Sequence, residues 1–198
     1  WGVPIVPTRI IKATEALDLT EVYKEMGPFV LKPTISAGAK DTFLVTSQEE
    51  LTALELGDGQ VSSPFHQVRK GRDYLVQPFI SEIRDRGEWS CIFIGGQYTH
   101  TVLKRPKPGG WLVQEELGGS VHWGNPSKNV ISLAEKVFQT VCEKSSLLVK
   151  DNSIESHLVY ARIDIIETGR DRFVGELELI EPELFFLDQG NLPLHYLN

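Results

Sequence analysis

Three carboxylates in the last third of the chain are spaced so that they could act together. Within residues 172–182, Glu176 and Glu178 are two positions apart among apolar neighbours. Side chains of a strand alternate between its two faces, so both carboxylates point to the same side. A second apolar run just upstream carries Asp164 in its middle, and a hairpin centred on Arg170 sets Asp164 opposite Glu176. Three carboxylates then converge on one patch.

This acidic hairpin has two interpretations. Like charges at such distances repel each other unless one is protonated or a cation lies between them. Hard oxygen ligands of this kind suit Mg²⁺, which usually works together with substrate phosphates. The other interpretation is a solvent-facing acidic strip that is partly paired with Arg162, which faces Glu178 in the same register. The pattern alone leaves both open.

A second candidate is a lysine at the end of a strand. Lys32 closes a short apolar run, residues 29–32, and is followed by a loop of small residues, 34–42. A cation in this place can reach phosphate oxygens while backbone N–H groups of the loop cover them. There is no Walker pattern, and only Gly38 lies inside the loop. Taken alone, Lys32 is more simply explained as a solvated strand end.

The elements that must position these residues follow an α+β order, with short helices feeding antiparallel hairpins. A helix is predicted over 19–26, where Asp18 is the N-cap and Gly27 the stop. The clearest helix covers 128–144, because its apolar residues recur at helical spacing. Strands are predicted over four further ranges: 43–45, 89–94, 97–103 and 159–167. Gly95-Gly96 is the predicted turn between 89–94 and 97–103.

Three segments carry stop or loop signals. The run 74–80 reads as a strand that ends at Pro78, since proline cannot donate to a strand ladder. A capping box over residues 47–50 predicts a short helix that ends near Gly57. The Gly-, Ser- and Pro-rich residues 57–71 are expected to form a mobile loop.

Composition excludes some classes of function. The 198 residues suffice for one large or two small domains, and 41% hydrophobic and 24% charged residues are ordinary globular values. The net charge of −7 argues against a nucleic-acid surface but not against a nucleotide, which needs only a few local cations. No apolar run reaches the length of a membrane span, and no signal peptide opens the chain. Cys91 and Cys142 are expected to be free thiols, so we expect a cytoplasmic protein.

Several motifs occur in a fixed order along the chain. They are Val30-Leu-Lys32-Pro33 with the loop after it, the hinge-like 76–80, Gly87-Glu88, Lys104-Arg105 followed by Gly118-Gly119, and Asp164 followed by Glu176-Leu-Glu178. In this order the sequence resembles the ATP-grasp superfamily. The resemblance is to its glutathione synthetase and ribosomal S6 modification ligase branch, near the relatives of the cycloserine-forming cyclo-ligase, and covers nearly the whole chain.

The resemblance implies an α+β ATP-grasp fold of two α+β subdomains whose antiparallel sheets grip ATP between them. Residues 1–80 would be the small, lid subdomain, and residues 81–198 the large subdomain with the metal site. The N-terminal substrate domain of the family is expected to be absent from this chain. The implied cofactors are ATP and Mg²⁺.

Roles for single residues also come from the resemblance. Lys32 would contact the α- and β-phosphates, with Ser36 and Gly38 in the lid loop over them. The adenine would lie against the hinge, formed by Gln77, Pro78, Phe79 and Ile80. Glu82 or Glu88 would take the ribose hydroxyls, and Lys104 and Arg105 would meet the γ-phosphate or an acyl phosphate. Asp164, Glu176 and Glu178 would hold two Mg²⁺ ions.

The implied activity is an ATP- and Mg²⁺-dependent ligase that joins a small-molecule carboxylate to an amine or thiol through an acylphosphate, without a nucleic-acid or membrane partner; a homodimer is left open. The sequence departs from the family pattern in three places: Glu178 replaces a usual asparagine, Leu112-Val113 stands where relatives often carry arginine, and the N-terminal domain is expected to be absent. The second and third departures favour an alternative. The alternative is a non-catalytic, nucleotide-binding ATP-grasp regulatory module. A third hypothesis is an α+β domain whose acidic hairpin binds Ca²⁺ or a basic partner.

Overall fold

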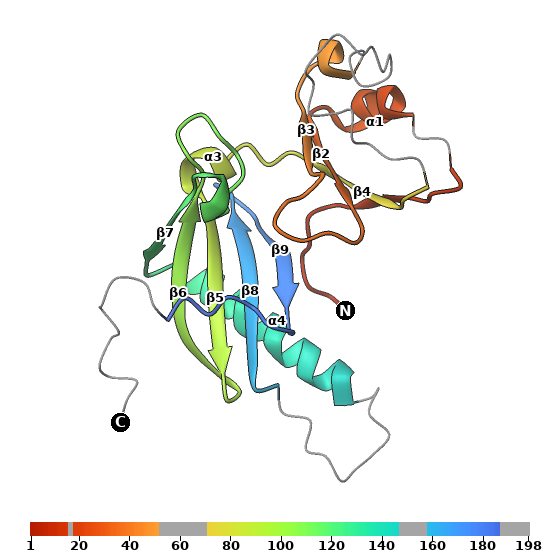
Figure 1. Cartoon of the computed structure of the whole chain (residues 1–198). Coiled ribbons are helices and arrows are strands. Elements are labelled where there is room, and N and C mark those ends of the chain that lie inside the picture. Colours follow the sequence, from red (N-terminus) through yellow and green to blue (C-terminus); the bar gives the residue numbers. More distant parts are fainter. Residues whose placement is uncertain (16–17, 52–70, 147–157, 187–198) are drawn as a thin grey trace. The chain divides into compact units, whose positions relative to one another are not determined.

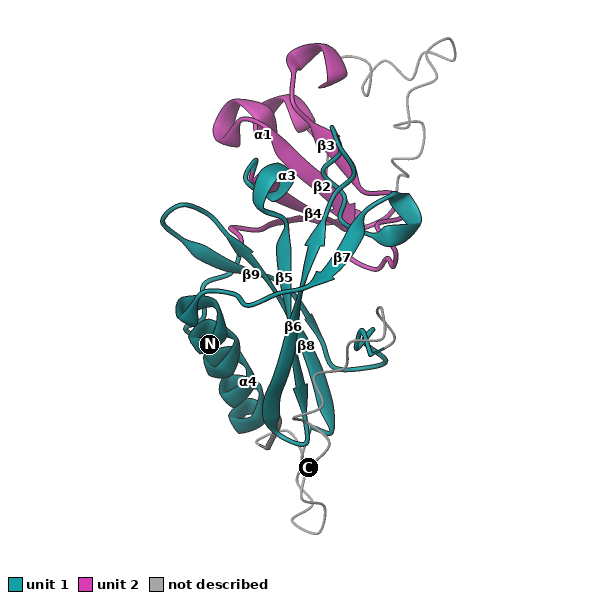
Figure 2. Cartoon of the chain, turned by 90° about the vertical axis from the view of Figure 1, so that its left-hand side faces the viewer, with its two compact units in different colours: residues 1–5, 81–198 teal, residues 6–80 magenta. Residues whose placement is uncertain are grey.

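The structure is a computed structural model that describes residues 1–15, 18–51, 71–146 and 158–186. It consists of two compact units (Figure 2), which we call the small unit, residues 6–80, and the large unit, residues 1–5 and 81–198. Each unit contains one sheet with a helix packed on it (Figure 1). None of the helices in these described ranges is long and apolar enough to span a bilayer.

The sheet of the small unit is antiparallel and has the strand order β1-β4-β2-β3. Its strands are β1 (Arg9–Ile11), β2 (Phe29–Pro33), β3 (Phe43–Val45) and β4 (Tyr74–Pro78). Helix α1 (Leu19–Met26) packs on one face of this sheet through Leu19 and Val22. The burial alternates along β2 and β4, so every second side chain leaves the core and belongs to the opposite face.

Helix α1 begins and ends where the sequence predicts. The side chain of Asp18 accepts a hydrogen bond from the Glu21 backbone N–H at 2.8 Å, which satisfies one of the free donors at the helix start. Gly27 ends the helix with a φ of 71°, and its N–H donates to the Tyr23 carbonyl. A left-handed backbone of this kind is easiest for glycine.

The sheet of the large unit is antiparallel with the order β7-β6-β5-β8-β9. Its strands are β5 (Glu88–Ile94), β6 (Gln97–Arg105), β7 (Ser120–Trp123), β8 (Tyr160–Glu167) and β9 (Arg172–Glu178). Two short helical turns, α3 (Ile83–Arg86) and η2 (Glu115–Leu117), lie in the connections. Helix α4 (Lys128–Ser146) covers one face of the sheet (Figure 1).

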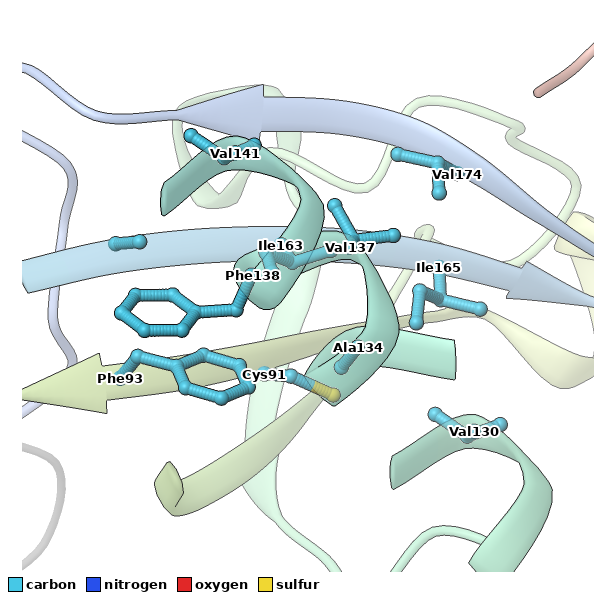
Figure 3. Packing of buried hydrophobic residues seen from close by; sticks show 11 residues of the cluster. Cys91, Phe93, Val130, Ala134, Val137, Phe138, Val141, Ile163, Ile165 and Val174 are labelled. Atoms are coloured by element: carbon cyan, nitrogen blue, oxygen red, sulfur yellow. The ribbon is translucent and has the colours of Figure 1, made fainter. Parts of the chain in front are cut away.

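The core of the large unit lies between α4 and this sheet (Figure 3). The rings of Phe93 on β5 and Phe138 on α4 stack with centroids 4.6 Å apart and an interplanar angle of 5°. Cys91, Ile163 and Ile165 are fully buried beside them. Because strand side chains alternate, the face of the sheet opposite α4 receives the residues between these core positions. That face carries the charged residues described below.

Most predicted elements are confirmed. The helices and strands expected over 19–26, 29–32, 43–45, 128–144 and 159–167 are present, and the Gly95-Gly96 hairpin joins β5 to β6. The strand predicted over 74–80 ends at Pro78, as expected. Both cysteines are free, and burial raises the pKa of the Cys91 thiol to about 12. The predicted loop over 57–71 and the end of the helix near Gly57 lie outside the described residues, apart from Gly71.

The sequence did not predict β1, α3 or β7. Strand β1 has three residues and pairs with β4, so it depends on a distant partner and has no pattern of its own. Strand β7 lies in the polar, glycine-rich stretch after β6, where it extends the sheet at its edge. Short strands of this kind are formed by tertiary pairing, which outweighs local propensity.

We predict that Phe138→Ala lowers the free energy of unfolding by about 3 to 5 kcal/mol, because it removes a buried ring from the stack with Phe93 and leaves a cavity. Chemical denaturation monitored by circular dichroism measures the change. Val159→Ala is the control, since Val159 is 68% exposed and its truncation should cost at most about 0.5 kcal/mol. Equal losses in the two variants would contradict the assignment of the core.

Candidate functional site

The face of the large sheet opposite α4 carries a cluster of ionised side chains, which we call the polar face. Its members pair directly across neighbouring strands: Glu88 with Lys104, Asp164 with Glu176, and Arg162 with Glu178. Directly paired residues point to the same side of a sheet. Four strands, β6, β5, β8 and β9, therefore bring four carboxylates and two cations together.

Asp164 lies at the centre of the polar face and is fully buried. One carboxylate oxygen accepts from the Lys104 ammonium at 2.7 Å, and the other accepts from Arg162 Nε at 3.0 Å. Burial alone would raise the pKa of the Asp164 carboxyl, but the charges of Lys104 and Arg162 outweigh this effect and hold the pKa below its usual range. Asp164 is therefore ionised at neutral pH.

Lys104 is almost as enclosed as Asp164. Its ammonium lies 2.8 Å from Glu88 and 2.7 Å from Asp164, and its side chain is only 10% exposed. Burial lowers the pKa of Lys104, but the carboxylates of Glu88 and Asp164 raise it by more, so that the net pKa is above its ordinary value. Lys104 is a fixed positive charge within the sheet face.

Arg162 joins all three carboxylates of the acidic hairpin. Its Nε donates to Asp164, while its Nη2 donates to Glu176 at 3.3 Å and to Glu178 at 2.5 Å. The side chain is 9% exposed, whereas those of Glu176 and Glu178 are 55% and 32% exposed. The guanidinium thus lies beneath two carboxylates that still reach solvent.

Glu176 is the carboxylate least compensated by this network. Partial loss of hydrating water, followed by repulsion from Asp164, Glu88 and Glu178, raises the pKa of Glu176 to about 7. Lys104 opposes the rise but does not cancel it. Glu176 therefore exchanges a proton near neutral pH.

A bulge in the hairpin sets the register of these acids. The pairs on the turn side, such as Glu167 with Arg172, are shifted by one residue relative to Asp164 with Glu176, and the extra residue is Gly175. A Cβ at Gly175 would lie 2.9 Å from a carboxylate oxygen of Glu88. The predicted pairing of Asp164 with Glu176 is confirmed, but it depends on this bulge, which the sequence analysis did not include. A lone glycine inside a strand was the signal for it.

The donor set fits a hard divalent cation. Four negative formal charges on Glu88, Asp164, Glu176 and Glu178 face two positive charges on Lys104 and Arg162. The polar face therefore has two more carboxyl groups than cations, and carboxylate oxygens are the ligands that Mg²⁺ and Ca²⁺ prefer. Within the described ranges, no three carboxylate, histidine or cysteine side chains converge closely enough to hold a metal ion as they stand. In this arrangement the acids of the hairpin are bonded to Arg162 instead.

The other residues predicted on the large unit lie in different places. Arg105 follows Lys104 directly on β6, so the two side chains leave opposite faces of the strand, and Arg105 is exposed. The structure does not bring them together. Glu82 precedes α3 and accepts a hydrogen bond from the Ser81 hydroxyl at 3.3 Å. Glu88 is bound to Lys104, so a ribose contact from Glu88 would share its carboxylate with that lysine.

Among the described residues of the small unit, no helix covers the sheet face opposite α1. Lys32 lies on it, level with Leu75, and Val30 lies between Leu44 and Gln77. These side chains are partly exposed. Backbone pairing places a lysine and an amide among apolar side chains on one face of the sheet.

The residues of the predicted hinge follow one another at the end of β4. The Gln77 side chain donates a hydrogen bond to the Thr8 hydroxyl at 2.9 Å, and Pro78 ends β4. The Phe79 N–H donates to Pro28 O at 2.9 Å, and Ile80 ends the small unit.

The loop after Lys32 is held in a tight conformation. Gly38, Ala39 and Asp41 have φ values of 59°, 55° and 59°, which only glycine adopts without cost. The Ser36 hydroxyl donates to the Lys40 carbonyl at 2.6 Å. Asp41 forms an ion pair of 3.0 Å with Arg72, two residues before β4. The loop is thus anchored at its far end.

Comparisons with known proteins agree with this architecture. No family model matches the chain. The chain is 26% identical over 191 residues to the cycloserine biosynthesis protein DcsG of Streptomyces lavendulae, which covers 92% of this chain and 59% of that protein. The crystal structure of D-cycloserine synthetase DcsG matches with a TM-score of 0.67 at 20% identity, covering 91% of this chain and 59% of that one.

Two further solved structures share the fold. D-alanine–D-alanine ligase from Bacillus anthracis matches with a TM-score of 0.58 at 17% identity, over 90% of this chain and 52% of that one. The ATP-grasp ligase PsnB, in a complex with a minimal precursor, Mg and ADP, matches with a TM-score of 0.52 at 11% identity, over 90% of this chain and 45% of that one. The chain therefore has the ATP-grasp fold, and the resemblance inferred from the sequence is confirmed. The chain spans about six tenths of the length of the curated relative it matches.

We predict that the metal-free protein loses stability, relative to Glu176→Gln, as the pH rises from about 5 to 8. The pKa of Glu176 is higher in the folded chain than its ordinary value of 4.5, so the folded state binds more protons and is favoured at low pH. This contribution is lost as the pH rises through about 7. Urea unfolding of both proteins in EDTA at several pH values measures the difference, and parallel pH profiles would contradict it.

Proposed function

We propose that the protein is an ATP- and Mg²⁺-dependent ligase that activates a carboxylate as an acylphosphate and joins it to an amine or thiol. The observation that carries the proposal is the polar face, where four carboxyl groups beside two cations offer oxygen ligands for a divalent cation. The ATP-grasp fold supports it, because DcsG and D-alanine–D-alanine ligase are synthetase and ligase by name.

Nucleotide binding is proposed for the open face of the small unit. Lys32 supplies a positive charge for the α- and β-phosphates, and the anchored loop with Ser36 and Gly38 supplies backbone N–H groups to cover them. The neighbouring apolar side chains and the hinge from Gln77 to Ile80 offer a flat surface for adenine. The Phe79 N–H is already bonded to Pro28 O, so the adenine contacts would come from other groups of the hinge. Glu82 or Glu88 would take the ribose.

Asp164, Glu176 and Glu178 are proposed to hold Mg²⁺. When bound, the metal would neutralise charge on the β- and γ-phosphates during phosphoryl transfer. Lys104 would supply a second, permanent positive charge, because Glu88 and Asp164 keep its ammonium protonated and fixed in direction. A preorganised charge of this kind stabilises a transition state without reorganisation of its surroundings. Arg105 leaves the opposite face of β6, so we assign the contact with the transferred phosphate to Lys104.

The two substrates are proposed only as classes. By their names, the matched relatives are a D-cycloserine synthetase, a D-alanine–D-alanine ligase and a ligase solved in a complex with a minimal precursor. A carboxylate and an amine are the groups common to amide-type ligation. The chain spans about six tenths of its curated relative, and the identity of both substrates is not part of the proposal.

We expect the protein to bind the non-hydrolysable analogue AMPPNP in the presence of Mg²⁺, measured by isothermal titration calorimetry. Lys32→Met should weaken the affinity about tenfold or more, because it removes a charge that contacts phosphate oxygens. Lys24→Met is the matched control, since Lys24 is exposed on α1 and its loss should leave the affinity unchanged. Absence of AMPPNP binding to the intact protein would refute the nucleotide site.

We expect turnover as release of ADP and phosphate when amino-acid-like carboxylates are added together with amines. Glu176→Ala should abolish the metal-dependent release without loss of the fold, as judged by circular dichroism. Nucleotide binding without phosphate release for any substrate of the screen would favour the non-catalytic nucleotide-binding module. Unchanged turnover in Glu176→Ala would overturn the metal assignment.

A further inference from the structure

We propose that Arg162 is an internal counter-ion that occupies the place of the divalent cation and must release Glu176 and Glu178 when the metal binds. The inference rests on the proposed metal site. It adds to that site a residue of the chain that competes with the metal and thereby sets how tightly the metal is bound.

The bonding of the guanidinium carries the inference. The Nε of Arg162 is bonded to the buried Asp164, and its Nη2 is bonded to both Glu176 and Glu178. One planar cation thus contacts the same three carboxylates that would ligate Mg²⁺. The Nη2 group uses Oε2 of Glu176 and Oε1 of Glu178. A metal ion that takes these two oxygens displaces the Nη2 group, so the two cations compete there.

Burial explains why an arginine has to be in this place. Asp164 is fully buried, and an uncompensated charge in such a position costs several kcal/mol. Lys104 is shared with Glu88, so it does not compensate the hairpin acids alone. Arg162 therefore lets the polar face fold without metal. It is itself 9% exposed, and the Phe185 ring lies 5.9 Å from its Cζ, which adds a cation–π contact.

Geometry also fixes which bonds are exchanged. The bond from Nε to Asp164 lies at the buried end of the side chain, whereas the bonds of Nη2 lie at the end nearest solvent, where Glu176 and Glu178 are partly exposed. An incoming cation reaches the exposed carboxylates first. The Nη2 group would then leave, while Nε stays with Asp164.

The test is the affinity for Mn²⁺ alone, measured on the full chain without nucleotide by the disappearance of the free-ion electron paramagnetic resonance signal. Arg162→Met removes a positive charge from the ligands, so it should bind Mn²⁺ about tenfold or more tightly than the unsubstituted protein. Arg162→Lys is the matched control for charge, because it keeps the positive charge beside the carboxylates, and its affinity should stay within about threefold of the unsubstituted protein. Equal or weaker binding by Arg162→Met would overturn the proposal.

The folding of Arg162→Met should also require metal or be stabilised by it, because the carboxylates would otherwise lack a counter-ion. A melting temperature that Mg²⁺ raises more in this variant than in the unsubstituted protein supports the proposal. If the variant does not fold even in Mg²⁺, the ¹⁵N signals of the Arg162 side chain in the unsubstituted protein decide: they should change on addition of Mg²⁺, and unchanged signals overturn the proposal. Failure of AMPPNP binding would instead refute the nucleotide function, since these experiments contain no nucleotide.

Discussion

The structure of the large unit depends on one buried charge, the carboxylate of Asp164. A fully buried ionised group is tolerated only where opposite charges and hydrogen bonds replace its water. Lys104 on β6 and Arg162 on β8 provide both, at 2.7 and 3.0 Å. Lys104 must reach across β5 to contact Asp164, whereas Arg162 lies two residues away on the same strand, β8. The strand order, the register of the hairpin and the bulge at Gly175 therefore all serve this arrangement.

The two sheets are organised in the same way, with one apolar face and one polar face. In each unit one face is closed by a helix, α1 or α4, and its core is almost wholly apolar. The other face carries polar and charged side chains that could bind a ligand. They are Lys32 and Gln77 in the small unit, and the polar face in the large unit. Alternation along the strands separates packing from chemistry, so either can be changed with little effect on the other.

The sequence predicted most elements because their signals are local. Asp18 and Gly27 mark the ends of α1, and apolar spacing marks α4. It also predicted the pairing of Asp164 with Glu176. It did not predict the central place of Arg162, because only the three-dimensional arrangement shows that one guanidinium reaches three carboxylates. Lys104 and Arg105 were treated as a pair, although neighbours on a strand point to opposite faces.

Asp164, Glu176 and Glu178 are proposed to hold a divalent cation beside a bound nucleotide. Paramagnetic broadening by Mn²⁺ tests it most directly, in two-dimensional ¹H–¹⁵N spectra recorded with AMPPNP. If these residues hold the metal, substoichiometric Mn²⁺ selectively broadens the backbone signals of residues 162–164 and 176–178, and Glu176→Gln weakens the broadening. Broadening confined to other acidic residues, such as Asp85 of α3, or no selective broadening at all, would contradict the proposed metal site.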